Sequence, residues 1–173
     1  MIKRYLLLIF ISFLLNGPVY SAKTSSTTLG TGGRNDLSHM KAKNSNFKKG
    51  SDALKQAKRY LKKGKEKKAK KRFNDALKFF TLANDENPNK PDILNYLGFT
   101  SRKVGDFAMA EIYYELGLEL DPQHNGINEY LGKLYIETNR IDKAKEKLKV
   151  LENCKCKEFE DLKAAINKGS SKY

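Results

Sequence analysis

Apolar and polar residues recur with a helical period from residue 51 onward. Ser51 or Asp52 can cap a first helix, whose apolar residues are spaced three and four positions apart along one face: Ala53, Leu54, Ala57, Tyr60 and Leu61. Gly64 interrupts this helix, and a second apolar stripe runs through residues 69–83. Pro88 ends the second helix, because proline donates no N–H and clashes with the preceding turn.

The segment that begins at Pro91 predicts two helices joined by a tight turn. Proline suits the first turn of a helix, where its missing donor has no helical partner to lose. Residues 104–107 read as the turn, and a second helix runs from Ala108 to Leu120, before Asp121-Pro122. Because the loop is so short, the two helices must lie antiparallel as a hairpin.

Residues of one kind return at a period of 34 positions. The matching sets are Pro88 and Pro122; Leu97-Gly98 and Leu131-Gly132; Ala76, Ala110 and Ala144; Phe73, Phe107 and Ile141; Phe80, Tyr114 and Leu148; and Gly64, Gly98 and Gly132. Small residues suit the points where helices cross closely, and large residues fill the space beside them. Repeats of this length stack their apolar faces into one continuous core. The sequence therefore predicts an all-α protein.

These motifs resemble the tetratricopeptide repeat family, in particular its small exported bacterial members. The family pattern is met by Leu97-Gly98, Gly105-Asp106-Phe107, Ala110, Tyr114 and Asp121-Pro122. The resemblance implies a short α-solenoid of antiparallel helical hairpins. We expect a basic, divergent hairpin over 51–90, repeats over 91–124 and 125–156, and a capping helix over 157–168. The first helix of 51–90 departs from the pattern because it is rich in lysine.

The resemblance also implies a binding surface, because the first helices of such repeats line a concave groove. By repeat phase, this groove should contain Asp92, Asn95, Phe99, Arg102, Lys103, Glu129, Lys133, Ile136 and Glu137. A protein or peptide partner would lie there as an extended strand or a helix. The alternative is that these are ordinary solvated positions. The residue set that grips a terminal dicarboxylate in some family members is incomplete, so we do not infer that ligand.

Residues 1–22 have the order of a secretory signal peptide. A short positive start is followed by an apolar run from Tyr5 to Leu15, and then by Asn16-Gly-Pro18. We expect a secreted or periplasmic protein; the alternative is an uncleaved anchor in the inner membrane. Residues 23–50 contain many Ser, Thr, Gly and Lys and few large apolar residues, so we expect a disordered linker there.

Positive charge is concentrated between Lys41 and Arg72. This stretch has 15 basic residues and only two acidic ones, whereas the whole chain of 173 residues carries a formal charge of +14. Segment 41–72 could attach to anionic lipid or to an anionic envelope polymer, or it could be a solvated helix. No motif with the spacing of a nucleic-acid-binding module is present, and we expect no nucleic-acid partner.

The sequence offers little for catalysis or cofactor binding. It has no phosphate-binding glycine loop, no nucleophile-elbow pattern and only two histidines, so we expect no enzyme and no cofactor. Glu111, Glu115 and Glu119 have the spacing of a solvated helix face. Cys154 and Cys156 leave three alternatives open: a local disulfide, pairing with another chain, or part of a metal site.

Overall fold

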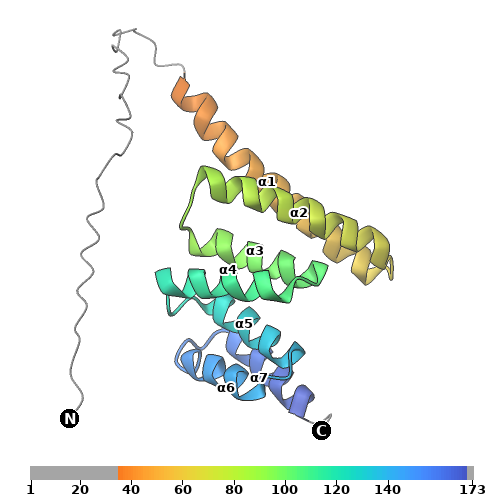
Figure 1. Ribbon diagram of the computed structural model, residues 1–173, viewed down its shortest axis with the longest axis vertical. Helices are drawn as coiled ribbons and strands as arrows, with labels where there is room; N and C mark the ends of the chain where they lie inside the picture. Colours follow the sequence, from red (N-terminus) through yellow and green to blue (C-terminus); the bar gives the residue numbers. More distant parts are fainter. Residues whose placement is uncertain (1–34, 171–173) are drawn as a thin grey trace, which may run out of the picture. The chain divides into compact units, whose positions relative to one another are not determined.

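The computed structural model describes residues 35–170, with side chains from 45 to 169. These residues form seven helices: α1 (Asn35–Lys62), α2 (Glu66–Glu86), α3 (Pro91–Val104), α4 (Phe107–Leu120), α5 (Asn125–Glu137), α6 (Ile141–Val150) and α7 (Lys157–Ser170) (Figure 1). No strand occurs in this part of the chain. Within it, no helix is both long and apolar enough to cross a membrane. The expected signal peptide (1–22) and linker residues 23–34 lie outside the described residues.

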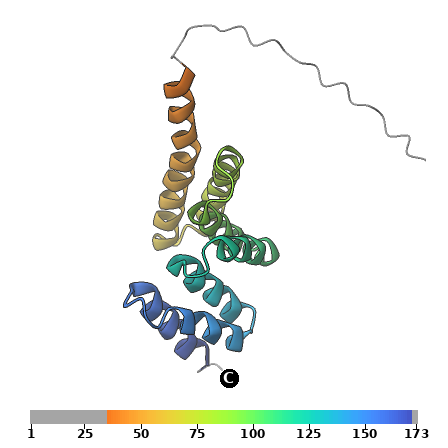
Figure 2. The same cartoon turned by 90° about the vertical axis from the view of Figure 1, so that its left-hand side faces the viewer.

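Successive helices pair as hairpins, and the hairpins stack in chain order. α1 packs against α2, α3 against α4, and α5 against α6, while α2–α3 and α4–α5 contacts join one hairpin to the next (Figures 1 and 2). α7 covers the last hairpin by packing on α5 and α6. The predicted all-α helical-repeat solenoid with a capping helix is therefore confirmed.

The turn between α3 and α4 shows how the sequence sets these hairpins. Gly105 ends α3 in the left-handed region at φ 99°, which glycine adopts without a steric penalty. The N–H of Asp106 donates to the Ser101 carbonyl at 2.9 Å. The Asp106 carboxylate then caps α4 by accepting from the Met109 N–H at 3.0 Å. Both helix ends thus find partners within the turn.

Small residues bring the paired helices close together. Ala76, Ala110 and Ala144, which share one phase of the repeat, are all fully buried. Gly98 of α3 lies under the Tyr114 ring, and Gly132 of α5 lies under Leu162 of α7. The buried apolar residues form two clusters, one from α1 to α3 and one from α4 to α7, and Tyr130 packs against both.

The linker expected over 23–50 ends earlier than predicted, because α1 begins at Asn35. Phe47 lies edge-on to Phe80 at 5.7 Å between ring centroids and to Tyr96 at 5.5 Å. Gly50 is buried under Phe80. Ser51 and Asp52 therefore lie inside α1 and do not cap it. Local composition suggested a linker because the residues that bury Phe47 are more than thirty positions away along the chain.

The first hairpin is longer than the others. Gly50 packs against Phe80 as Gly98 packs against Tyr114, so Gly50 occupies the position that the 34-residue period assigned to Gly64. Gly50 precedes Ala76 by 26 residues, whereas Gly98 precedes Ala110 by 12. The difference of 14 residues lengthens each helix by about two turns. Gly64 instead forms the turn itself, at φ 65°, and its match to Gly98 and Gly132 was a coincidence of spacing.

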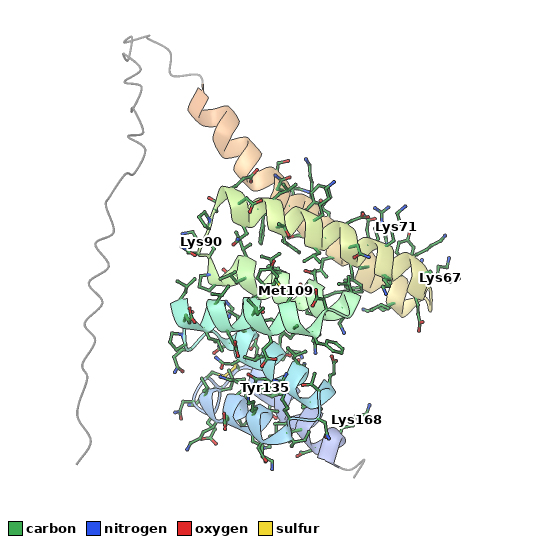
Figure 3. All side chains as sticks on the ribbon, in the orientation of Figure 1. Lys67, Lys71, Lys90, Met109, Tyr135 and Lys168 are labelled. Carbon is green, nitrogen blue, oxygen red and sulfur yellow. A yellow bond between two sulfur atoms is a disulfide. The ribbon has the colours of Figure 1, made fainter. Side chains whose placement is uncertain are left out.

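The extra turns carry much of the excess lysine. We call residues 59–72 the lysine-rich tip; they comprise the end of α1, the turn at Gly64 and the start of α2. Every residue from Leu61 to Lys68 is exposed. Lys67 and Lys71 lie toward the end of the hairpin, where its side chains point into solvent (Figure 3).

Candidate functional site

A groove of about 440 Å³ is formed by residues of α1, α3, α5 and α7. We call it the repeat groove. Three of the four helices are the first helices of their hairpins, and α7 stands in the place that a further first helix would take. Its lining residues are Lys58, Phe99, Arg102, Lys103, Tyr130, Lys133, Ile136, Glu137 and Ala165.

Two aromatic rings form the apolar part of the repeat groove. Phe99 and Tyr130 lie with ring centroids 5.1 Å apart at an interplanar angle of 52°. Phe99 also contacts Phe73 of α2 at 6.3 Å, which anchors the groove to the core. The repeat equivalent of Phe99 is Lys133, one turn beyond Tyr130 in α5. Aromatic faces of this kind can receive an apolar side chain or a cation.

Four cationic side chains surround these rings. Lys58 Nζ lies 5.0 Å from the Phe99 ring centroid and Lys103 Nζ lies 5.7 Å from it. Lys133 Nζ lies 5.9 Å from the Tyr130 centroid. The Arg102 guanidinium lies within 6 Å of both rings. Each placement is favourable for a cation–π interaction.

Acidic residues neutralise only part of this charge. Arg102 is buried and donates to Glu137 Oε1 at 3.2 Å, while its buried Nε has no hydrogen-bond partner. Lys133 pairs with the buried carboxylate of Glu129. Burial, together with the nearby positive charge of Arg102, lowers the pKa of Lys103. The repeat groove therefore has a net positive field that favours an anionic ligand.

Most of the residues expected in the groove do lie together. Six of the nine line the repeat groove: Phe99, Arg102, Lys103, Lys133, Ile136 and Glu137. The other three lie elsewhere. Asp92 contacts His124 Nε2 at 3.1 Å, Asn95 lies beside Gly126, and Glu129 is buried beneath Lys133.

Three lining residues were not predicted from sequence. Tyr130 repeats Tyr96 at the 34-residue period, so the period could have identified it. Lys58 was missed because the groove was predicted only from the repeats over 91–156. A period of 34 residues places Lys58 in phase with Asp92, so the same period could have identified it. Ala165 comes from α7, which the repeat pattern does not place.

The two cysteines of the chain form a disulfide with each other. Cys154 and Cys156 are linked across a single intervening residue, in the loop between α6 and α7. Of the three alternatives for this pair, the structure contains the local disulfide. Among the described residues, no three His, Cys, Asp or Glu side chains are grouped as a metal site would require.

Comparison with known proteins gives one family match and many structural matches. The tetratricopeptide repeat family profile matches residues 91–124, and no curated protein matches the chain significantly. Among solved structures, the first repeat domain of Spaghetti (RPAP3) bound to the HSP90 peptide SRMEEVD is 20% identical. It covers 73% of this chain and 94% of its own, with a TM-score of 0.51.

Two further structures show the same fold. The TPR2B domain of yeast Sti1 in complex with pHsp70 is 17% identical, covers 72% of this chain and 98% of its own, and has a TM-score of 0.54. The Yersinia enterocolitica secretion chaperone SycD, in complex with a peptide of the translocator YopD, is 15% identical. It covers 70% of this chain and 89% of its own, with a TM-score of 0.50. Residues 91–124 therefore form a tetratricopeptide repeat, and the described helices share the fold of solved tetratricopeptide repeat domains.

Proposed function

We propose that the protein is a binding module that holds an acidic peptide segment of a partner protein in the repeat groove. The observation that carries this proposal is the cluster of Lys58, Arg102, Lys103 and Lys133 around two aromatic rings. The similar structures from RPAP3, Sti1 and SycD were solved with peptide or protein ligands. These ligands support a peptide as the general class of partner.

The geometry suits a segment that combines carboxylates with an apolar residue. An apolar side chain can pack on the half-buried Tyr130 ring, whose centroid lies 5.1 Å from that of the buried Phe99 ring. Carboxylates on either side can then meet the ammonium groups of Lys58, Lys103 and Lys133. Charge-assisted hydrogen bonds of this kind are stronger than neutral ones. The groove would thus contribute binding energy without reacting with its ligand.

Peptide binding tests the proposal directly. Labelled peptides that alternate Glu with Leu or Phe are titrated with the protein, and fluorescence anisotropy gives the Kd. Peptides with Lys in place of Glu serve as the charge control. We expect only the acidic set to bind, and Phe99→Ala to weaken that binding by about tenfold or more.

A matched pair of variants isolates the groove charge. Lys58→Gln, Lys103→Gln and Lys133→Gln are combined in one protein, and Lys78→Gln, Lys90→Gln and Lys149→Gln in another. The second set is exposed and lies outside the repeat groove, and both proteins lose three positive charges. We expect the first variant to lose at least about tenfold in affinity and the second to bind almost as the wild type does. Equal losses in the two variants would mean that net charge, not the groove, attracts the peptide.

A second candidate function is attachment to an anionic surface through the lysine-rich tip. Within residues 59–72, nine side chains are basic and one, Glu66, is acidic. The described ion pairs neutralise one of these cations, Arg72, which pairs with Asp75. Leu61 is 44% exposed beside the lysines. This combination supports binding to an anionic lipid bilayer or an anionic envelope polymer.

Sedimentation with vesicles tests the second candidate. Vesicles with and without phosphatidylglycerol are compared at about 0.05 M and about 0.5 M salt. We expect binding only to the anionic vesicles at low salt, and its loss in Lys62→Gln, Lys63→Gln, Lys67→Gln. The Lys78→Gln, Lys90→Gln, Lys149→Gln protein is again the control.

We also propose that the protein works outside the cytoplasm, in the secretory space or the periplasm. Residues 1–22 support this proposal through their positive start and apolar run. Cell fractionation combined with N-terminal sequencing tests it. A cleaved chain in the soluble extracytoplasmic fraction is expected. A full-length chain in the inner-membrane fraction would support the anchored alternative, and a chain in the cytoplasm would contradict both.

A further inference from the structure

The disulfide between Cys154 and Cys156 closes an unusually small ring. One residue, Lys155, separates the two cysteines. Neither cysteine is fully buried, so both remain partly open to another molecule. Neither belongs to the repeat groove, and only Cys154 packs against the apolar cluster of α4–α7. Ligand binding in the repeat groove therefore does not explain why the chain contains this disulfide.

Lys155 adopts a backbone conformation that lysine avoids. Its φ is 48°, in the left-handed region. The other non-glycine residues with positive φ in the described part of the chain are Asn89 and Asn139, and asparagine tolerates this region far better than lysine does. Lys155 lies inside the cystine ring, so the covalent link holds it there. Opening the disulfide would release this constraint and thereby favour the reduced form.

The position of Cys156 also favours a thiolate. Cys156 comes immediately before α7, which begins at Lys157. The first turn of a helix exposes unpaired N–H groups and carries a partial positive charge, which stabilises an anion beside it. Lys155 and Lys157 add positive charge nearby, although Asp161 pairs with Lys157 and offsets part of it. Cys156 is thus the better leaving group of the pair.

We propose that Cys154 and Cys156 form a thiol–disulfide exchange site, which accepts electrons from a dithiol of a partner protein. One partner thiolate attacks Cys154 Sγ; an S–S bond forms between the two proteins, and Cys156 leaves as a thiolate. The second partner thiolate then attacks the partner sulfur of this mixed disulfide and releases Cys154 as a thiolate. The partner dithiol is oxidised to a disulfide, and the Cys154–Cys156 disulfide is reduced to two thiols. Two electrons are transferred, and the two partner protons pass to solvent or to the released thiolates.

Equilibration with glutathione tests the proposal on the full chain. The protein is incubated with about 10 mM reduced glutathione and graded amounts of oxidised glutathione. Free thiols are then trapped and counted by mass spectrometry. An exchange site should become more than half reduced within this series, because structural disulfides resist the glutathione pool. A pair that stays oxidised throughout the series would overturn the proposal.

Two variants separate the contribution of the backbone from that of charge. Lys155→Asn and Lys155→Gln both remove the positive charge, but Asn accepts the left-handed conformation and Gln does not. We expect the Asn variant to be about tenfold harder to reduce than the Gln variant. Equal equilibrium constants for reduction of the disulfide in these two variants would contradict the proposed effect of the Lys155 backbone conformation. Circular dichroism of both variants checks that the helices remain folded.

Transfer to a dithiol is the second readout. The oxidised protein is mixed with a reduced peptide that contains two cysteines, and peptide disulfide formation is followed by mass spectrometry. We expect the wild type to oxidise the peptide at least about tenfold faster than oxidised glutathione does at equal concentration. Cys156→Ala should trap a mixed disulfide through Cys154 when oxidised glutathione is added. A wild-type rate no higher than that of oxidised glutathione would overturn the proposal.

Discussion

Gly98 lies directly under the ring of Tyr114, so that a β-carbon added at Gly98 would come within 2.5 Å of Tyr114 Cε1. The tyrosine is fully buried, and its ring has no free space into which it can move. This contact sets how closely α3 and α4 approach each other. The same relationship holds between Gly50 and Phe80 in the first hairpin, where the distance would be 2.8 Å.

Gly98→Ala should therefore destabilise the protein. Added volume in a packed core costs about 1–3 kcal/mol, and we expect the free energy of unfolding to fall by that amount. Urea denaturation followed by circular dichroism measures it. Gly126→Ala is the matched control, because its β-carbon would come close to the end of the Asn95 side chain and otherwise make ordinary contact with His124. If Gly126→Ala lowered the free energy of unfolding as much as Gly98→Ala does, the packing explanation would be contradicted.

Tyr114 should make the protein sensitive to alkaline pH. Its hydroxyl is buried without a hydrogen-bond partner, and burial raises the pKa of Tyr114 far above its usual value of 10.0. As the pH rises past about 10, the unfolded chain loses this proton while the folded protein keeps it. The free energy of unfolding must therefore decrease with pH.

Tyr114→Phe should remove this pH dependence. We expect a protein at least as stable as the wild type at neutral pH, because an unpaired polar group has left the core. Between about pH 10 and pH 11 its unfolding free energy should decline less steeply than that of the wild type. Urea denaturation across this range measures the slope. Tyr113→Phe, at the half-buried neighbouring position, is the control; identical slopes in wild type and Tyr114→Phe would contradict the prediction.

The ion pair between Glu111 and Arg140 should stabilise the protein at neutral pH but not at low pH. Both guanidinium Nη atoms donate to the carboxylate at 2.7 Å, which joins α4 to the start of α6. The hydrogen bond from Arg140 lowers the pKa of Glu111. The stabilisation is fully present above the usual glutamate pKa of 4.5 and is lost as the pH falls through the lower folded value.

Glu111→Gln should lower the unfolding free energy by about 1 kcal/mol at pH 7. The difference from the wild type should shrink as the pH falls below the usual glutamate value and the wild-type carboxylate takes up a proton. Thermal unfolding at several pH values measures it. Glu119→Gln on the exposed face of α4 should show no such convergence. A constant difference between Glu111→Gln and the wild type at all pH values would mean that shape, not charge, is responsible.

The cap of α4 gives a fourth stability prediction. Asp106 accepts a hydrogen bond from the Met109 N–H at 3.0 Å. Asp106→Ala should lower the unfolding free energy by about 1 kcal/mol. Asp106→Asn should retain most of the stabilisation from the cap, because the amide oxygen can still accept the hydrogen bond. The change in Tm measures both effects. An Asn variant as unstable as the Ala variant would point to the charge and not to the cap.

The hairpins from α3 onward could be predicted because their contacts repeat at fixed spacing. Ala110 and Ala144 are buried for the same reason in successive repeats, and the tight turn at Gly105 is visible in the sequence itself. The length of the first hairpin could not be predicted. Its extra 14 residues correspond to about two turns in each helix, so the apolar stripes continue on the same faces. The apolar pattern of the sequence therefore shows no break in the first hairpin, and Gly64 falls in phase with Gly98 and Gly132 by chance.

The repeat groove was predictable only where repeat phase determines which way a side chain points. Phe99, Lys103 and Lys133 follow from phase alone, and the groove contains them. The burial of Arg102 and its pairing with Glu137 depend on contacts between separate helices, which no sequence spacing expresses. Phe47 illustrates the same limit, because a single aromatic residue in a polar segment gains its partners only when the chain has folded.

The extra length of the first hairpin has an electrostatic consequence. Two turns displace charge by about 10 Å, which is comparable to the screening distance in cellular salt. The outermost ammonium groups of the lysine-rich tip therefore act largely independently of those around Phe99 under such conditions, and an anion at one surface would have little effect on the attraction at the other. In dilute buffer the two fields merge, so that an occupant of either surface would weaken the attraction at the other.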